Sequence, residues 1–300
     1  YYTAKPSADI VQEIEPEISE EIVRLNRLSD KRRPRKTYFT GDEREISLMA
    51  LDLDSYTDII INKPEYTLTG NKNYVSEMSI RAKDNMDCRL DLMDIAVGNE
   101  NGGAAITVGQ NSTMTLNIVG EVTVTGGIYV PSSSTLRLNG AGALRVNSVG
   151  TQTYAIGSGC TMPYGNIEID MSGGIYIHLD GEKSVAIGGR SNDGGSHIRI
   201  RCKELEITQL GKKTLSIGSL LSPADIVIEG THVELEHHSK TALGIGSFSD
   251  PCNISISSGI SEFIMSGDKV GCIGSFNSCG GRTDMTSVRV ITELKAKEIL

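Results

Sequence analysis

Ala155-Ile156-Gly157-Ser158 is the first copy of a short phrase that recurs along the sequence. The phrase returns as Ala186-Ile187-Gly188-Gly189, Ser216-Ile217-Gly218-Ser219, Gly244-Ile245-Gly246-Ser247 and Cys272-Ile273-Gly274-Ser275. The isoleucines of consecutive copies are separated by 31, 30, 28 and 28 positions. A repeat of this length indicates a solenoid, because one short unit cannot bury its apolar face alone and must stack on copies of itself. The glycine after each isoleucine predicts a corner with unusual dihedrals or close backbone approach.

Between the copies, apolar residues alternate with polar ones in short runs. Ile167 and Ile169 form a first alternating pair, and similar pairs follow at Ile198 and Ile200, Ile226 and Ile228, Ile254 and Ile256, and Val288 and Val290. After a short turn comes a second pair, at Ile175 and Ile177, Leu205 and Ile207, and Val233 and Leu235. Period-two alternation is typical of a strand with one buried face. Three strands per repeat predict an all-β fold, a right-handed single-stranded parallel β-helix with about 28–31 residues per coil.

The β-helix is expected over residues 45–300, with the most regular coils in 154–292. Before it, residues 1–44 are predicted to be a linker with a short helix. That helix is suggested by apolar residues spaced along one side: Ile18, Ile22, Val23 and Leu25. The chain opens without an initiator Met or a signal peptide and ends without an obvious polar cap, which favours an excerpt of a longer protein.

The charge balance bears on partners. The formal net charge is −9, which argues against nucleic acid and anionic membrane surfaces, because both are held through clustered Lys and Arg. The basic cluster Lys31–Lys36 has Pro34 in its middle and is interpreted as solvated linker. No run of about 18 apolar residues occurs, so membrane insertion is not expected.

The six cysteines form no CxxC pair and show no zinc-type spacing with histidine. Cys252 and Cys279 occupy similar places in neighbouring repeats and could face one another. Separately buried free thiols are the preferred interpretation. A disulfide would instead indicate an oxidising compartment.

Glycine-rich phrases also carry a resemblance to a known family. Tyr154–Gly159, then Gly165-Asn166-Ile167-Glu168-Ile169 and Ser172-Gly173-Gly174-Ile175, are similar to the "GAGIGGG, GxIxIxGGxI" repeats of bacterial carbohydrate-binding-domain-containing surface proteins. Ala105–Val108 and Val122–Gly127 look like the entry coils of those proteins, and the resemblance covers roughly residues 50–292. It implies a β-helical module at the cell surface or outside the cell, which binds carbohydrate or another extracellular partner or serves as a rigid adhesin-like stalk.

An acidic ladder is predicted on the outward face of the third strand. Tyr176, Glu206, Glu234 and Glu262 precede equivalent apolar residues, and equivalent positions stack about 4.8 Å apart in a parallel β-helix. Stacked carboxylates repel, which raises a pKa or recruits a cation. Three interpretations are open: a Ca²⁺ site at Glu206, Glu234 and Glu262, a carboxylate pair for glycoside hydrolysis, or splayed and solvated glutamates.

Charges of opposite sign alternate on the second strand. Glu168 is expected over Arg199, and Asp170 over Arg201 over Glu229. Exposed pairs of this kind contribute at most about 1 kcal/mol each, so they are interpreted as setting the register.

Two further groups are weaker candidates for a site. Phe248 and Phe276 follow the repeated phrase and are interpreted as corner packing, or as a platform for a sugar ring if exposed. His232, His237 and His238 lie near Glu234 and Glu236 in the sequence, without the helical spacing of known metal motifs: none forms HExxH.

The sequence leaves two classes of function open. The first is a non-catalytic β-helical surface module, with no cofactor except Ca²⁺ and with Tyr176, Glu206, Glu234, Glu262, Phe248 and Phe276 as candidate ligand-binding residues. The alternative is a β-helical polysaccharide-active enzyme, a glycoside hydrolase or lyase. Loops between the predicted strands are short, and short loops cannot form the walls of a deep substrate-binding groove. The binding module is therefore the preferred prediction, and no catalytic residue is assigned.

Overall fold

The computed structural model describes residues 36–98, 103–191, 197–250, 252–275 and 283–294, with the backbone alone for 231, 258–261 and 283–294. The chain divides into two units after Lys36, and the structure below is that of the second unit, Thr37–Leu300. The helix expected near residues 18–25 lies outside the described residues.

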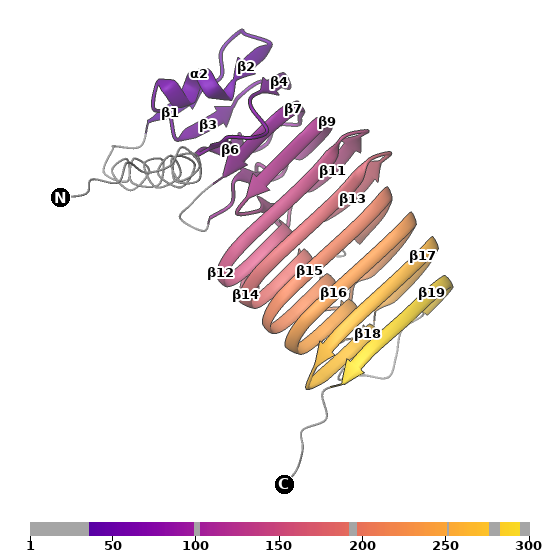
Figure 1. Cartoon of the computed structure of the whole chain (residues 1–300). Coiled ribbons are helices and arrows are strands. Elements are labelled where there is room, and N and C mark those ends of the chain that lie inside the picture. The colour runs from indigo at the N-terminus through magenta and orange to yellow at the C-terminus, as the bar shows by residue number, and fades with distance from the viewer. Residues whose placement is uncertain (1–35, 99–102, 192–196, 251, 276–282, 295–300) are drawn as a thin grey trace, which may run out of the picture. The chain divides into compact units, whose positions relative to one another are not determined.

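Strands dominate the second unit (Figure 1). In chain order they are β1 (Thr37–Phe39), β2 (Glu45–Ser47), β3 (Asp58–Ile61), β4 (Glu65–Thr69), β5 (Val75–Ser76), β6 (Ser79–Ala82), β7 (Cys88–Gly98), β8 (Ile106–Thr107), β9 (Thr113–Thr125), β10 (Ile128–Tyr129), β11 (Thr135–Gly140), β12 (Ala143–Gly157), β13 (Asn166–Met171), β14 (Gly174–Gly189), β15 (His197–Ser219), β16 (Asp225–Ser247), β17 (Asn253–Gly267), β18 (Lys269–Ser275) and β19 (Thr283–Leu294). The described helix α2 (Leu48–Leu53) has six residues. Among the described helices none is long and apolar enough to cross a membrane.

All pairings between the described strands are parallel, and each joins one coil to the next. The strands therefore stack as successive rungs (Figure 1). This arrangement confirms the predicted parallel β-helix.

One column of isoleucines runs through the stack from coil to coil. In register they are Ile59, Ile80, Ile106, Ile128, Ile156, Ile187, Ile217, Ile245 and Ile273. From Ile59 to Ile245 they are fully buried. The separations are 21, 26, 22 and 28 positions before Ile156 and 31, 30, 28 and 28 after it. The predicted coil length thus holds for the later coils, whereas three of the four earlier intervals are shorter.

The other predicted apolar pairs also form inward columns, with one exception. Ile167, Ile198, Ile226 and Ile254 share a column. Val290, however, pairs with Phe263 rather than lying in that column, and Thr283 is the residue opposite Ile254. The assignment of Val288 and Val290 to the first pair was wrong, because both inward strands show the same alternation and only the register separates them.

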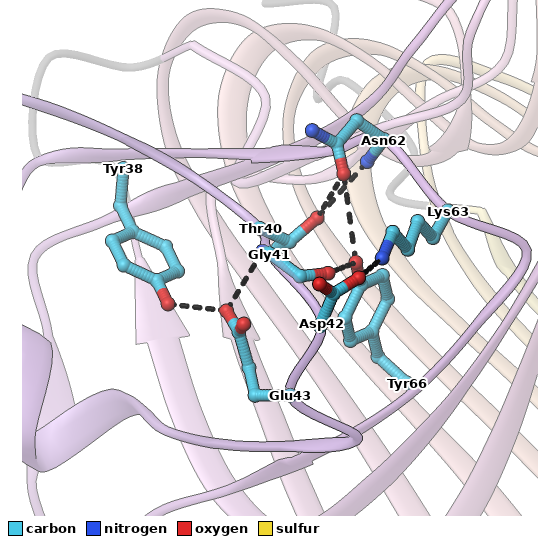
Figure 2. A network of polar contacts seen from close by, with 8 residues as sticks. All are labelled: Tyr38, Thr40, Gly41, Asp42, Glu43, Asn62, Lys63 and Tyr66. Atoms are coloured by element: carbon cyan, nitrogen blue, oxygen red, sulfur yellow. Dashed lines mark hydrogen bonds and ion pairs between the residues drawn. The ribbon is translucent and has the colours of Figure 1, made fainter.

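Polar contacts tie the first coils together (Figure 2). The Tyr38 hydroxyl donates a hydrogen bond to the carboxylate of Glu43. The hydroxyl of the buried Tyr66 donates to the backbone carbonyl of Gly41 at 2.9 Å. Because β1 pairs with β3, Thr37–Phe39 already belong to the stack, although they lie before the predicted start at residue 45.

A second, smaller core lies outside the isoleucine column of the later coils. Its buried residues are Val185, Leu215, Leu220, Leu243 and Phe248. Serines of the repeated phrase hold the loops that follow it. The Ser219 hydroxyl donates to the carbonyl of Arg190 at 3.0 Å, and the Ser247 oxygen accepts from the backbone N–H of Ser249 at 3.2 Å. These corners are therefore held by hydrogen bonds and have apolar packing of their own.

Candidate functional site

The predicted acidic ladder is present as a continuous column on the third strand. Tyr176, Glu206, Glu234 and Glu262 are consecutive partners in register. Arg145 precedes Tyr176 in the column and Arg289 follows Glu262. Neither arginine was predicted to belong to this column, the second because Val288 and Val290 were assigned to another strand.

Beside this column lies a second outward column, which was not predicted. Glu204 is paired in register with His232. It is two residues before Glu206, so both glutamates point to the same face of β15. One ligand atom from each of Glu204, Glu206 and His232 lies within 4.8 Å of the others, and all three residues are half-buried. These three residues are the cation-binding candidate, called the Glu–Glu–His cluster below.

Tyr176 and Arg145 border the Glu–Glu–His cluster. The Tyr176 hydroxyl donates a hydrogen bond to the carboxylate of Glu204. This bond, aided by burial, raises the pKa of Tyr176 to about 12. The Arg145 guanidinium lies 4.5 Å from the centroid of the Tyr176 ring, within the range of a cation–π contact. The phenol is therefore a neutral donor with one ring face covered by a cation.

Like charges concentrate at Glu206. Burial raises its pKa, and the neighbouring carboxylates of Glu204 and Glu234 raise it further, while His232 acts in the opposite direction. The His232 Nε2 atom lies 3.5 Å from an Oε2 atom of Glu234. A cation at this position would offset the repulsion among the carboxylates.

The donor set differs from the one predicted. Ca²⁺ was expected at Glu206, Glu234 and Glu262, but the structure brings Glu206 together with Glu204 and His232. Calcium takes oxygen ligands, whereas an imidazole beside carboxylates suits zinc and similar transition metals. The donor set of the cluster therefore resembles that of a zinc site more than that of a calcium site.

The other two histidines lie away from the cluster. His237 is fully buried, with Nδ1 2.7 Å from the Thr214 hydroxyl and Nε2 2.6 Å from the Ser216 hydroxyl. His238 is on the surface, with Nε2 2.7 Å from a carboxylate oxygen of Glu236. The three histidines do not converge on one point, and His232 is the one that belongs to the Glu–Glu–His cluster.

Phe248 is a packing residue. Its side chain is buried in the second core, and the ammonium of Lys213 lies 4.3 Å from its ring centroid. A ring covered in this way offers no platform for a sugar, so corner packing is the interpretation that holds. Phe276 lies outside the described residues.

The expected Cys252–Cys279 pair has one member in the described structure. Cys252 is buried there. Cys279 lies outside the described residues, so the alternatives of free thiols and a disulfide remain predictions.

Opposite charges on the second strand line a surface depression of about 630 Å³. The expected stacking of Glu168 on Arg199 and of Asp170 on Arg201 is present. The Arg201 guanidinium makes two hydrogen bonds to Asp170, at 2.8 and 2.6 Å. Glu168 instead bonds Arg137 of the preceding coil, at 2.8 Å. These charges are largely satisfied by one another, which fits the register-setting role.

Comparison with models of known families, with curated protein sequences and with solved structures finds no match for this chain.

Proposed function

We propose that the chain is a non-catalytic β-helical binding module whose ligand face is the outward face of the third strand. The observation that carries the proposal is the Glu–Glu–His cluster, bordered by Tyr176 and Arg145. A bound divalent ion would leave coordination positions open to ligand oxygens. Hydroxyl and carboxylate oxygens of a carbohydrate are suited to those positions.

The column arrangement favours a ligand with repeating units. Equivalent outward positions recur about every 4.8 Å along the stack, and Tyr176, Glu206, Glu234 and Glu262 extend the polar face over four coils. A polysaccharide strand offers hydroxyl groups at regular intervals along such a face. An extracellular or cell-surface location belongs to the proposal as well, and rests on the resemblance of the glycine-rich repeats.

Metal binding is tested first, by thermal unfolding with chelator, zinc or calcium. A ligand at 100 times its Kd stabilises the folded state by about 2.7 kcal/mol, so zinc is expected to raise the Tm by several degrees. Glu206→Gln removes one ligand, and Glu229→Gln is a control because Glu229 is an exposed glutamate of the second strand. The zinc response should vanish in the first variant and persist in the second. An equal response in all three proteins would contradict the cluster as the metal site.

Ligand binding is tested next, with a glycan array probed by the purified chain with and without zinc. Binding that needs zinc and is lost in Glu206→Gln supports the proposed face. Binding that is unchanged by chelator and by the substitution would place the carbohydrate site elsewhere.

One observation favours the alternative, a β-helical polysaccharide-active enzyme. Glu206 has a raised pKa next to the second carboxylate Glu204, which is the condition of a general acid in a glycosidase. Release of reducing ends from an acidic polysaccharide, abolished by Glu206→Gln, would support the enzyme over the binding module. Tight glycan binding without product release supports the module.

A further inference from the structure

A second polar pocket lies on the later coils, at the corner next to the second core. It has a volume of about 210 Å³. The residues of its lining that bear on the chemistry are Gln152, Cys160, Thr161, Lys183, Arg190 and Lys213. Gln152, Lys183 and Lys213 are consecutive in register, so the two ammonium groups are delivered by neighbouring coils. None of these residues belongs to the third-strand face.

The positive charges of this pocket form no ion pair with an acidic side chain among the described residues, although the charge of Lys183 acts on Glu182, the exposed partner of Lys212. No ion pair there involves Lys183, Lys213 or Arg190, and Arg190 bonds the backbone carbonyl of Thr161 at 3.4 Å. By contrast the adjacent Lys212, which is exposed, is paired with Glu182. A chain with a net charge of −9 thus leaves three cations together at one corner.

Lys213 is held in a partly dehydrated position. Its ammonium lies 4.3 Å from the centroid of the buried Phe248 ring. Burial lowers the pKa of Lys213, and the charge of Lys183 lowers it further. An anion in the pocket would relieve both effects, because it replaces lost hydration and offsets the repulsion between the two lysines.

The neighbouring thiol does not supply that anion. Lys183 and Lys213 favour the thiolate of Cys160, but burial outweighs them and the pKa of Cys160 is raised. The thiol is therefore neutral at pH 7, and the three cations remain uncompensated by it.

We propose that this corner pocket binds an oxyanion group, a carboxylate, sulfate or phosphate. Its volume corresponds to roughly seven water molecules and is below the usual range of about 300–1,000 Å³ for drug-sized ligands. It therefore suits one anionic group or one charged sugar ring. The Arg190 guanidinium offers paired N–H donors, the lysines offer ammonium donors, and Thr161 and Gln152 add neutral polar groups. The inference is independent of the acidic face, because the two sites share no residue.

Calorimetric titration tests this proposal, with sodium sulfate and with glucuronate as separate probes at constant ionic strength. Lys213→Met removes the half-buried cation, and Lys212→Met is the matched control, since Lys212 is the preceding residue and lies outside the pocket lining. Saturable binding is expected for the parent chain and for Lys212→Met, with affinity at least about tenfold weaker in Lys213→Met because a charge-assisted bond is lost. Saturation by sulfate alone identifies a site for free ions, and saturation by glucuronate alone identifies a site for a charged sugar.

Arg190→Gln is a second test, in case Lys213→Met binds weakly only because it is misfolded. Arg190 is exposed, so its replacement leaves the second core intact. This variant is also expected to bind at least about tenfold more weakly. Sulfate stabilises folded proteins in general by exclusion from their surfaces, so a rise in Tm common to all variants would not count as binding. Equal affinities in the parent chain, Lys213→Met and Arg190→Gln, or no saturable heat with either probe, would overturn the proposal.

Discussion

The coils before Ile156 and those after it differ in the residue that follows the column isoleucine. In the early coils this residue carries a side chain: Arg81 after Ile80, Thr107 after Ile106 and Tyr129 after Ile128. In the later coils it is always glycine: Gly157, Gly188, Gly218, Gly246 and Gly274. Parallel pairing alone does not require the glycine, because Tyr129 and Gly157 pair in the same column.

The backbone of the later coils explains the difference. Gly188 and Gly218 have φ angles of 127° and 135°, where side chains are disfavoured. A Cβ atom on Gly218 would lie 1.9 Å from the carbonyl oxygen of Gly246. The repeated phrase thus marks a tight corner that carries the second core. Coils of nearly equal length bring equivalent side chains into columns. Both candidate sites are formed by such columns and therefore lie largely on the later coils.

The largest effect is expected from a charge inside the isoleucine column of the later coils. Ile217 is fully buried, and Ile217→Asp would bury a carboxylate without a partner, a change expected to exceed about 4 kcal/mol. Because each coil contacts its neighbours only, unfolding should spread through the adjacent coils. Calorimetry with Ile217→Val as the control, expected to cost about 0.5–1.5 kcal/mol, measures this effect. An unchanged Tm in the aspartate variant would contradict the column.

A methyl group at the corner is expected to have the next largest effect. Gly218→Ala combines a disfavoured φ, which costs about 1–3 kcal/mol, with contact against the backbone of the next coil. Thr107→Ala changes the equivalent position of an early coil, where the residue already carries a Cβ. Denaturant unfolding should show a clear loss of stability for the first variant and little change for the second. Similar losses in both would remove the proposed distinction between early and later coils.

Much of the fold follows from the sequence, because inward positions repeat with period two and the corner phrase repeats with the coil. The assignment of Val288 and Val290 failed because two strands of each coil show the same alternation of apolar and polar residues. The register between coils, which distinguishes the two strands, is seen only in the structure. The early coils were predicted only coarsely because their separations vary and their corners lack glycine.

The candidate sites were only partly predictable for a different reason. The acidic column was found by comparing one outward position across coils. Glu204 and His232 occupy the neighbouring outward column and are separated by the same interval as Glu206 and Glu234, so the same comparison would have found them. Lys183 and Lys213 repeat with the interval of Ile187 and Ile217. The pocket that they line, however, also depends on the loops, and the repeat does not predict the path of a loop.

A polar interior is a further property of the later coils, and it makes their stability sensitive to pH. His237 shares a column with Gln209 and Met265 and is enclosed by the hydroxyls of Thr214 and Ser216. Burial, with a smaller effect of His238, lowers its pKa to about 3. The imidazole is thus neutral in the folded chain, while the unfolded chain binds a proton below about pH 6.5.

The smallest effect is therefore an acid-dependent loss of stability. Between about pH 6.5 and pH 3 the unfolded state binds a proton at His237 that the folded state does not bind. The free energy of unfolding therefore falls as the pH falls below 6.5, by on the order of 2 kcal/mol at pH 5. The raised pKa of Glu206 acts in the opposite direction, because its protonation in the folded state adds stability as the pH falls. His237→Met, which places the residue type of the next coil in the column, removes the titrating group. Denaturant unfolding at pH 7 and pH 5 should show a smaller difference in this variant than in the parent chain. Equal differences would mean that His237 is not what makes the later coils sensitive to acid.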